Sequence, residues 1–127
     1  MKQLLFAMSV VMLAVLSIAA SARQAPDDER RAAIRVLRAI NTAENAAKQK
    51  SGKYLAISEL LEHPGMGGVR PDFTVNGNAI TYRDAQVRLA LSADATQYIV
   101  TVVGRAPSYT AAFSDEQGVI YTGKALE

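Results

Sequence analysis

Apolar residues recur every three or four positions in one segment of the chain. The members of this apolar stripe are Ala33, Val36, Leu37, Ile40, Ala43 and Ala47. Because an α-helix repeats every 3.6 residues, these positions fall on a single face. The pattern predicts one long helix over residues 23–53, with Pro26 in its first turn and Gly52 just beyond its end. A helix of this kind is marginally stable alone in water, so the apolar stripe requires a partner surface.

From residue 72 onward the apolar period shortens to two, the period of a β-strand. Alternating or β-branched segments lie at residues 73–75, 79–82, 87–91, 98–103, 109–113 and 119–121. Asn76-Gly77 predicts a hairpin turn, and residues 114–118 (SDEQG) predict a longer one that ends on a left-handed Gly. This order predicts an α+β domain in which the helix covers one face of an antiparallel sheet of three to five strands.

The N-terminal residues have the three regions of a secretory signal peptide. Lys2 precedes an apolar run at residues 4–16 (LLFAMSVVMLAVL), and Ala20-Ser21-Ala22 supplies small residues before Arg23. Cleavage there predicts a leader of residues 1–22 and an exported mature domain of residues 23–127. The alternative is an uncleaved membrane anchor over residues 4–20, although such a helix rises only about 25 Å against a hydrocarbon core of about 30 Å. Membrane attachment is expected only if the leader is retained, and the exported form is expected in the periplasm or outside the cell.

Composition narrows the chemistry open to this chain. Its 127 residues include no Cys and one His, and its formal net charge is +2. The lack of Cys excludes disulfides, thiolate metal sites and a cysteine nucleophile. A charge this small does not indicate a nucleic-acid partner. No nucleophile-and-base motif is recognisable, so we expect no enzymatic activity and keep a small carboxylate-based hydrolase as an alternative.

Three arginines of the predicted helix are candidate partner-binding residues. Arg31, Arg35 and Arg38 share one helical face, and we call them the arginine row. The arginine row either docks an acidic partner or is the solvated face opposite the apolar stripe. In the second case Asp28 and Arg31 are expected to pair within the helix.

Three stretches of the sequence resemble the globular part of type IV pilins and type II secretion pseudopilins. Residues 33–60 (AIRVLRAINTAENAAKQKSGKYLAISEL) are similar to the second half of the pilin spine helix and the loop after it. Residues 97–105 are similar to the strand before the final hairpin, and residues 112–126 (AFSDEQGVIYTGKAL) to the closing hairpin. The resemblance implies a pilin-like fold over roughly residues 32–126 and contacts with other proteins of a secretion or pilus system.

The resemblance also bears on metal binding, because some pseudopilins bind calcium near the corresponding strands. Asp94, Asp115 and Glu116 are therefore candidate calcium ligands. Carboxylates at such positions more often form the turns themselves, and the ligand spacing of an EF-hand is absent. No other cofactor is expected.

The N-terminal residues depart from the pilin pattern. Residues 4–20 contain no Glu and no Gly precedes Gly52, so the prepilin peptidase site and the assembly glutamate of the family are absent. The sequence therefore predicts an exported, non-enzymatic pilin-like domain that contacts other envelope proteins, without predicting a fibre subunit. The alternative is a free periplasmic or secreted binding domain with no role in assembly.

Overall fold

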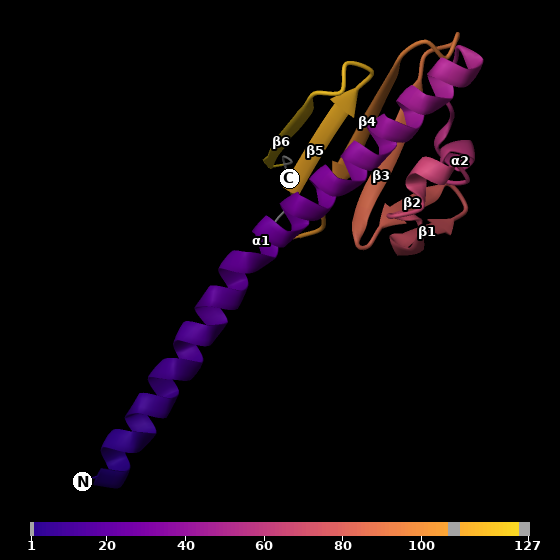
Figure 1. Ribbon diagram of the computed structural model, residues 1–127. Coiled ribbons are helices and arrows are strands. Elements are labelled where there is room, and N and C mark those ends of the chain that lie inside the picture. Colours follow the sequence, from indigo (N-terminus) through magenta and orange to yellow (C-terminus); the bar gives the residue numbers. More distant parts are fainter. Residues whose placement is uncertain (1, 107–109, 125–127) are drawn as a thin grey trace.

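One long helix lies along one face of an antiparallel sheet (Figure 1). The computed structural model describes residues 2–106 and 110–124, with side chains described from Asp27 onward. Helix α1 spans Lys2–Ser51, and three short helical turns follow it: α2 (Ile57–Leu60), η1 (Pro64–Met66) and η2 (Arg70–Asp72). The first half of α1 extends beyond the sheet, whereas its second half runs along the strands.

Six antiparallel strands form a single sheet in chain order. They are β1 (Phe73–Asn76), β2 (Ala79–Tyr82), β3 (Ala85–Leu91), β4 (Tyr98–Val103), β5 (Thr110–Asp115) and β6 (Ile120–Lys124). The α+β class is confirmed, and the expected three to five strands are too few. All six segments join the sheet because every connection between consecutive strands is short enough to keep neighbours paired. Tyr109, expected to start the fifth strand, lies outside the described residues.

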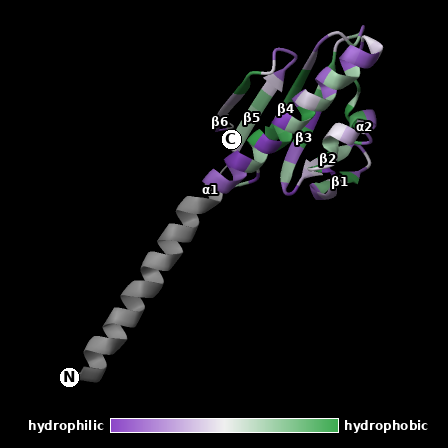
Figure 2. Ribbon diagram, in the orientation of Figure 1, coloured by the Kyte–Doolittle hydropathy of each residue, from purple (hydrophilic) through white to green (hydrophobic). Residues whose placement is uncertain are grey.

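The apolar stripe of α1 is buried along its whole length. None of its six residues is more than 7 % exposed. The stripe packs chiefly on β5, with β4 and β6 on either side and η1 and α2 along its flank. Figure 2 shows apolar and polar positions alternating along this part of α1. The predicted packing of the helix on the sheet is therefore confirmed.

The C-terminal end of α1 agrees with the sequence prediction, and its N-terminal end does not. Gly52 has a φ of 82°, and its N–H donates to the carbonyl of Lys48 at 2.7 Å. The helix continues through Pro26 to Lys2 instead of starting near the proline. Proline in a helix interior disfavours the helix by about 3 kcal/mol, so the sequence predicted an end where the helix continues. Where the side chains are described, no helix is both long and apolar enough to cross a membrane.

Two tight turns differ from the sequence prediction in detail. The predicted Asn76-Gly77 turn is shifted by one residue, because Asn76 pairs with Ala79 across a turn made by Gly77 and Asn78. Gly77 supplies the positive φ, at 62°. In the next turn Arg83 has a φ of 54°, a region that glycine usually occupies. A two-residue hairpin turn needs a residue with positive φ, and the sequence has no glycine at position 83 to predict one.

We expect Val36→Asp or Ile40→Asp to unfold the domain. Both side chains are fully buried against the sheet, so either change places an unpaired charge in the core and lowers the free energy of unfolding by several kcal/mol. Thermal melting measures the effect, and Ala46→Asp on the exposed side of α1 is the matched control. Melting curves unchanged by all three substitutions would contradict the packing of α1 on the sheet.

Candidate functional site

The arginine row lies on the solvent-facing side of α1, as its spacing predicts. Arg31, Arg35 and Arg38 are all exposed. Arg31 Nη1 lies 3.9 Å from Asp28 Oδ1 in the expected pair within the helix, and Arg35 Nη2 donates to the carbonyl of Gly68 at 3.3 Å. Arg35 therefore ties α1 to the connection between η1 and η2. Both arrangements are those of a solvated helix face, and a docking role for the row stays a prediction.

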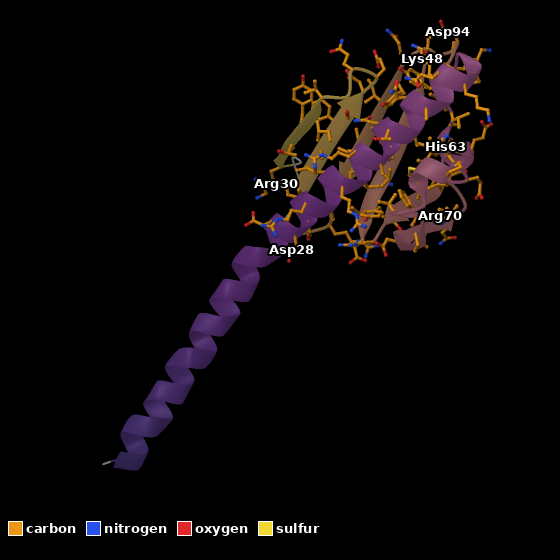
Figure 3. All side chains as sticks on the ribbon, viewed as in Figure 1. Asp28, Arg30, Lys48, His63, Arg70 and Asp94 are labelled. Carbon is orange, nitrogen blue, oxygen red and sulfur yellow. The ribbon has the colours of Figure 1, made fainter. Side chains whose placement is uncertain are left out.

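The three candidate calcium ligands act as hydrogen-bond acceptors in two different turns. Asp94 lies in the β3–β4 turn, at the end of the domain where α1 finishes near Lys48 (Figure 3). Its Oδ1 accepts from the hydroxyls of Thr96 at 2.7 Å and Ser92 at 2.8 Å, and from the Thr96 N–H at 3.2 Å. These hydrogen bonds, from Thr96 first and then Ser92, lower the pKa of Asp94 to about 2.

The other two carboxylates lie where β5 turns into β6, with Asp115 as the last residue of β5 and Glu116 in the connection. Asp115 Oδ1 accepts from the Gln117 N–H at 3.0 Å, and Glu116 Oε2 from the Tyr98 N–H at 3.4 Å. Gly118 ends this turn with a φ of 81°, as predicted. In the part of the chain that the structure describes, no group of three or more His, Cys, Asp or Glu side chains is arranged to hold a metal ion. Calcium binding stays a prediction.

A buried carboxyl group in α1 was not anticipated. Glu44 is 0 % exposed, and its Oε1 accepts from the Leu55 N–H at 2.7 Å, whereas Oε2 has no partner among the described residues. Burial raises the pKa of Glu44 from 4.5 to about 7, and the hydrogen bond from Leu55 opposes this only in part. The sequence did carry a signal, because position 44 falls on the same helical face as Ile40 and Ala47.

Asn41 joins α1 to the sheet through a chain of hydrogen bonds. Its Oδ1 accepts from the Tyr98 hydroxyl at 2.6 Å, and its Nδ2 donates to Ser114 Oγ at 2.8 Å. The buried Ser114 hydroxyl in turn donates to the carbonyl of Val119 at 2.8 Å. Burial first, and then the nearby Glu44 carboxyl, raise the pKa of Tyr98. This network fixes the lateral position of α1 on β4 and β5.

Next to this network lies an open cavity of about 360 Å³. It is lined by Asn41, Thr42, Asn45, Tyr54, Tyr98, Glu116, Gln117 and Gly118. The rings of Tyr54 and Tyr98 meet edge to face, 4.8 Å apart, beneath it. Both Asn41 side-chain groups and the Tyr98 hydroxyl are already engaged in the network, so these groups serve the fold.

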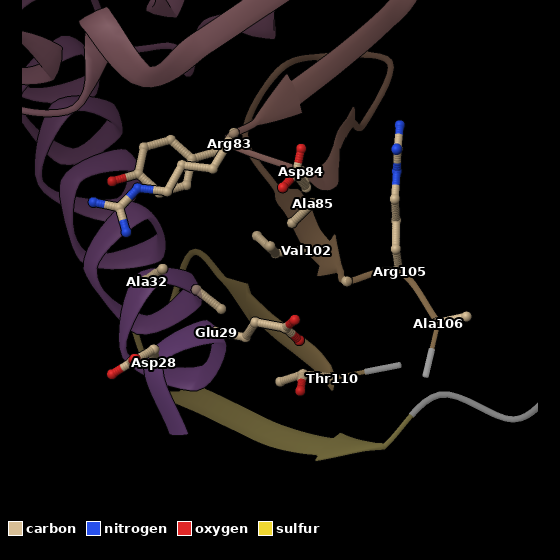
Figure 4. Close-up of a pocket in the computed structure, with 13 residues that line it drawn as sticks. Asp28, Glu29, Ala32, Arg83, Asp84, Ala85, Val102, Arg105, Ala106 and Thr110 are labelled. Carbon is tan, nitrogen blue, oxygen red and sulfur yellow. The ribbon is translucent and has the colours of Figure 1, made fainter. Parts of the chain in front are cut away.

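A second cavity of about 380 Å³ lies beside the start of the buried half of α1 (Figure 4). Its lining carries both signs of charge, with Glu29 and Asp84 beside Arg83 and Arg105, and it includes the apolar Ala32 and Val102. Arg83 Nε lies 3.5 Å from Asp72 Oδ2, outside the cavity rim. The Tyr82 hydroxyl is buried without a partner among the described residues. The mixed charges select no single class of ligand.

The outer face of the sheet, turned away from α1, carries three large apolar side chains. We call this set the apolar sheet face: Ile99 on β4, Phe113 on β5 and Tyr121 on β6, exposed by 58 %, 49 % and 50 %. Phe113 and Tyr121 are directly paired across the strands, and their rings stack with centroids 4.9 Å apart. Because successive strand residues point to opposite faces, these three alternate with the buried Val100 and Ala112.

The sequence predicted the strands that carry the apolar sheet face but not the face itself. Of the strand tyrosines, Tyr82 and Tyr98 are buried, whereas Tyr121 is half exposed. The signal was that each of β4–β6 contains consecutive apolar residues, which places apolar side chains on both faces of the sheet. Comparisons with protein-family models, with curated proteins and with solved structures each found no match.

The stability of the fold is expected to fall as pH rises from about 5 to 8, with Glu44 as a main cause. The folded-state pKa of Glu44 is raised, so folding takes up a proton between 4.5 and about 7, and this stabilisation is lost as pH passes through the folded-state value. At about 1.4 kcal/mol per pKa unit, the loss reaches at most about 3 kcal/mol.

Urea unfolding at a series of pH values measures this dependence. Glu44→Gln keeps an acceptor for the Leu55 N–H without the ionisable group, so we expect a flatter profile and higher stability than the parent at pH 8. The exposed Glu59→Gln is the control and is expected to follow the parent. Parallel profiles for the parent and Glu44→Gln would show that Glu44 does not titrate in this range.

Proposed function

We propose that this chain is an exported, non-enzymatic pilin-like domain that acts by contact with other envelope proteins through its apolar sheet face. The observation that carries the proposal is the exposure of Ile99, Phe113 and Tyr121 on one side of three neighbouring strands. Apolar side chains scattered singly over a surface are ordinary, whereas a contiguous group marks an interaction site.

The geometry of the three side chains supports their grouping. Phe113 lies opposite Tyr121 on one side and opposite Thr101 on the other, while Ile99 pairs with Asp115 and is thus a diagonal neighbour of Phe113. The stacked pair of aromatic rings is held by two hydrogen-bonded strands, so little conformational entropy is lost when a partner covers it. Aromatic residues are enriched at the centres of protein interfaces for this reason.

The arrangement of the elements also supports the proposal. A long helix followed by an antiparallel meander is the arrangement that the resemblance to pilins implies, and α1 covers the inner face of β5 with parts of β4 and β6. A partner must therefore use the outer face or an edge of these strands. Arg31 and Arg35 already have partners within the chain, which favours the sheet face over the arginine row as the contact.

Site-specific photo-crosslinking in the native envelope tests this function. A crosslinking residue at position 99 is expected to capture a different envelope protein, and Phe113→Lys is expected to reduce that capture strongly because it places a charge in the apolar contact. Position 75 on β1 is the matched control, because Val75 is 50 % exposed on a strand far from this face.

Two results would contradict the proposed contact: equal capture at positions 75 and 99, or capture at 99 that Phe113→Lys leaves unchanged. A variant with Arg31, Arg35 and Arg38 all changed to Glu examines the arginine row in the same assay. We expect it to capture as the parent does.

Export makes a separate prediction about the mature N-terminus. Because Ala20-Ser21-Ala22 is a small-residue cleavage site, we expect the exported protein to begin at Arg23. Intact-mass measurement on material from the envelope or medium decides this. A mass that includes residues 1–22 would instead support the membrane-anchored alternative.

A further inference from the structure

Strand β6 is an edge strand that lacks the usual protection against further pairing. It is hydrogen-bonded to β5 alone, and no other described strand pairs with its outer side. Its residues Tyr121, Thr122, Gly123 and Lys124 are all exposed. Natural edge strands are commonly blocked by proline, a bulge or several charges, and β6 carries only Lys124 at its end. Beside it lies the apolar sheet face.

We propose that β6 pairs antiparallel with β6 of a second copy of this chain, which joins the two sheets into one. This inference goes beyond the proposed function, because it names an occupant for the edge that borders the apolar sheet face. The register that the sequence of β6 allows favours a second copy as the partner of this strand.

In the register that pairs all five residues, Thr122 lies opposite Thr122 of the second copy. Tyr121 then lies opposite Gly123, and Ile120 opposite Lys124. Residues directly opposite in an antiparallel pair point to the same face, so both apolar sheet faces lie on the same side of the joined sheet. A shift by one residue would turn one copy over and separate these faces.

Each Tyr121 ring finds open space over Gly123 of the second copy in this register. A Cβ added at Gly123 would meet no atom within 4 Å, and its neighbour on β5 is the small Ala111. An aromatic side chain placed across from a strand glycine covers the exposed backbone there and stabilises the pair. Because the pair is symmetric, this contact between Tyr121 of one copy and Gly123 of the other forms twice.

Charge does not oppose this pairing. The two Lys124 residues are four strand positions apart, or about 14 Å, which exceeds a Debye length of about 8 Å at physiological salt. A five-residue edge with one ring per copy buries less than the roughly 800 Å² per partner of a standard stable interface. The dimer is therefore weak and concentration-dependent.

A cysteine crosslink tests the register. The chain has no Cys, so Thr122→Cys introduces the only thiol. Opposite Cα atoms in an antiparallel pair lie about 4.5–5.5 Å apart, within the range of about 4.4–6.8 Å that a disulfide spans. We expect Thr122→Cys in the full chain to form a disulfide-linked dimer faster than Thr74→Cys, an exposed threonine on the other edge strand, β1. Equal rates would overturn the proposal.

Sedimentation equilibrium with a charged variant tests the pairing at the two-fold axis. The parent chain is expected to gain mass with concentration, and Thr122→Glu to remain monomeric, because this register places the two carboxylates directly opposite each other. Thr122→Glu should melt close to the parent, since Thr122 is exposed. Thr74→Glu, at the exposed threonine of β1, is the matched control and should still dimerise.

The outcomes separate this inference from the proposed function. A parent chain that stays monomeric at high concentration overturns the second copy as occupant, whether or not the edge takes up a peptide from another protein. A dimer that forms while position 99 captures no other envelope protein leaves the pairing of β6 intact and contradicts the proposed function. Dimerisation of Thr122→Glu at the affinity of the parent also overturns the pairing.

Discussion

Close contact between α1 and the elements around it holds this domain together, and small side chains make it possible. Half of the apolar stripe consists of alanine, and η1 crosses α1 where Ala43 meets Gly65. A Cβ added at Gly65 would lie 3.2 Å from Ala43 Cβ, so a larger residue at either position would force the two backbones apart. The connection from α2 to η2 is thereby held on the flank of the helix, and Phe73 and Tyr82 of the first hairpin pack together beside it.

Local patterns predicted those parts of the fold that local physics decides. The apolar stripe, the left-handed Gly52 and the six alternating segments each follow from a short stretch of sequence. The number and register of the strands depend on turns, and there the prediction was incomplete. Arg83 takes a φ of 54° although a β-carbon disfavours it, because pairing on both sides holds the turn in place. No glycine or asparagine stands next to Arg83 in the sequence to predict this conformation.

The polar interior was the part least accessible from sequence. Glu44 stands among apolar positions on the helix, and a charged residue there is normally assigned to the surface. Its burial follows from a contact distant in sequence, the Leu55 N–H that would otherwise lack an acceptor where the chain turns back along α1. Asn41 meets Tyr98 and Ser114 for the same reason. Hydrogen-bonding needs of segments far apart in the chain, and not periodicity, selected these residues.

The candidate contact surface follows from how the two faces of the sheet are used. The inner face of β5, with parts of β4 and β6, is covered by α1, whereas the outer face of the neighbouring β3 is polar, with Gln86 and Arg88 exposed. On the outer face, the large exposed apolar side chains therefore lie on β4–β6, next to the unprotected edge of β6. Leaving rings in water and an edge strand unpaired both disfavour the isolated domain. We assign the rings to a contact with another envelope protein and the edge of β6 to a second copy of this chain, and each contact removes one of these penalties.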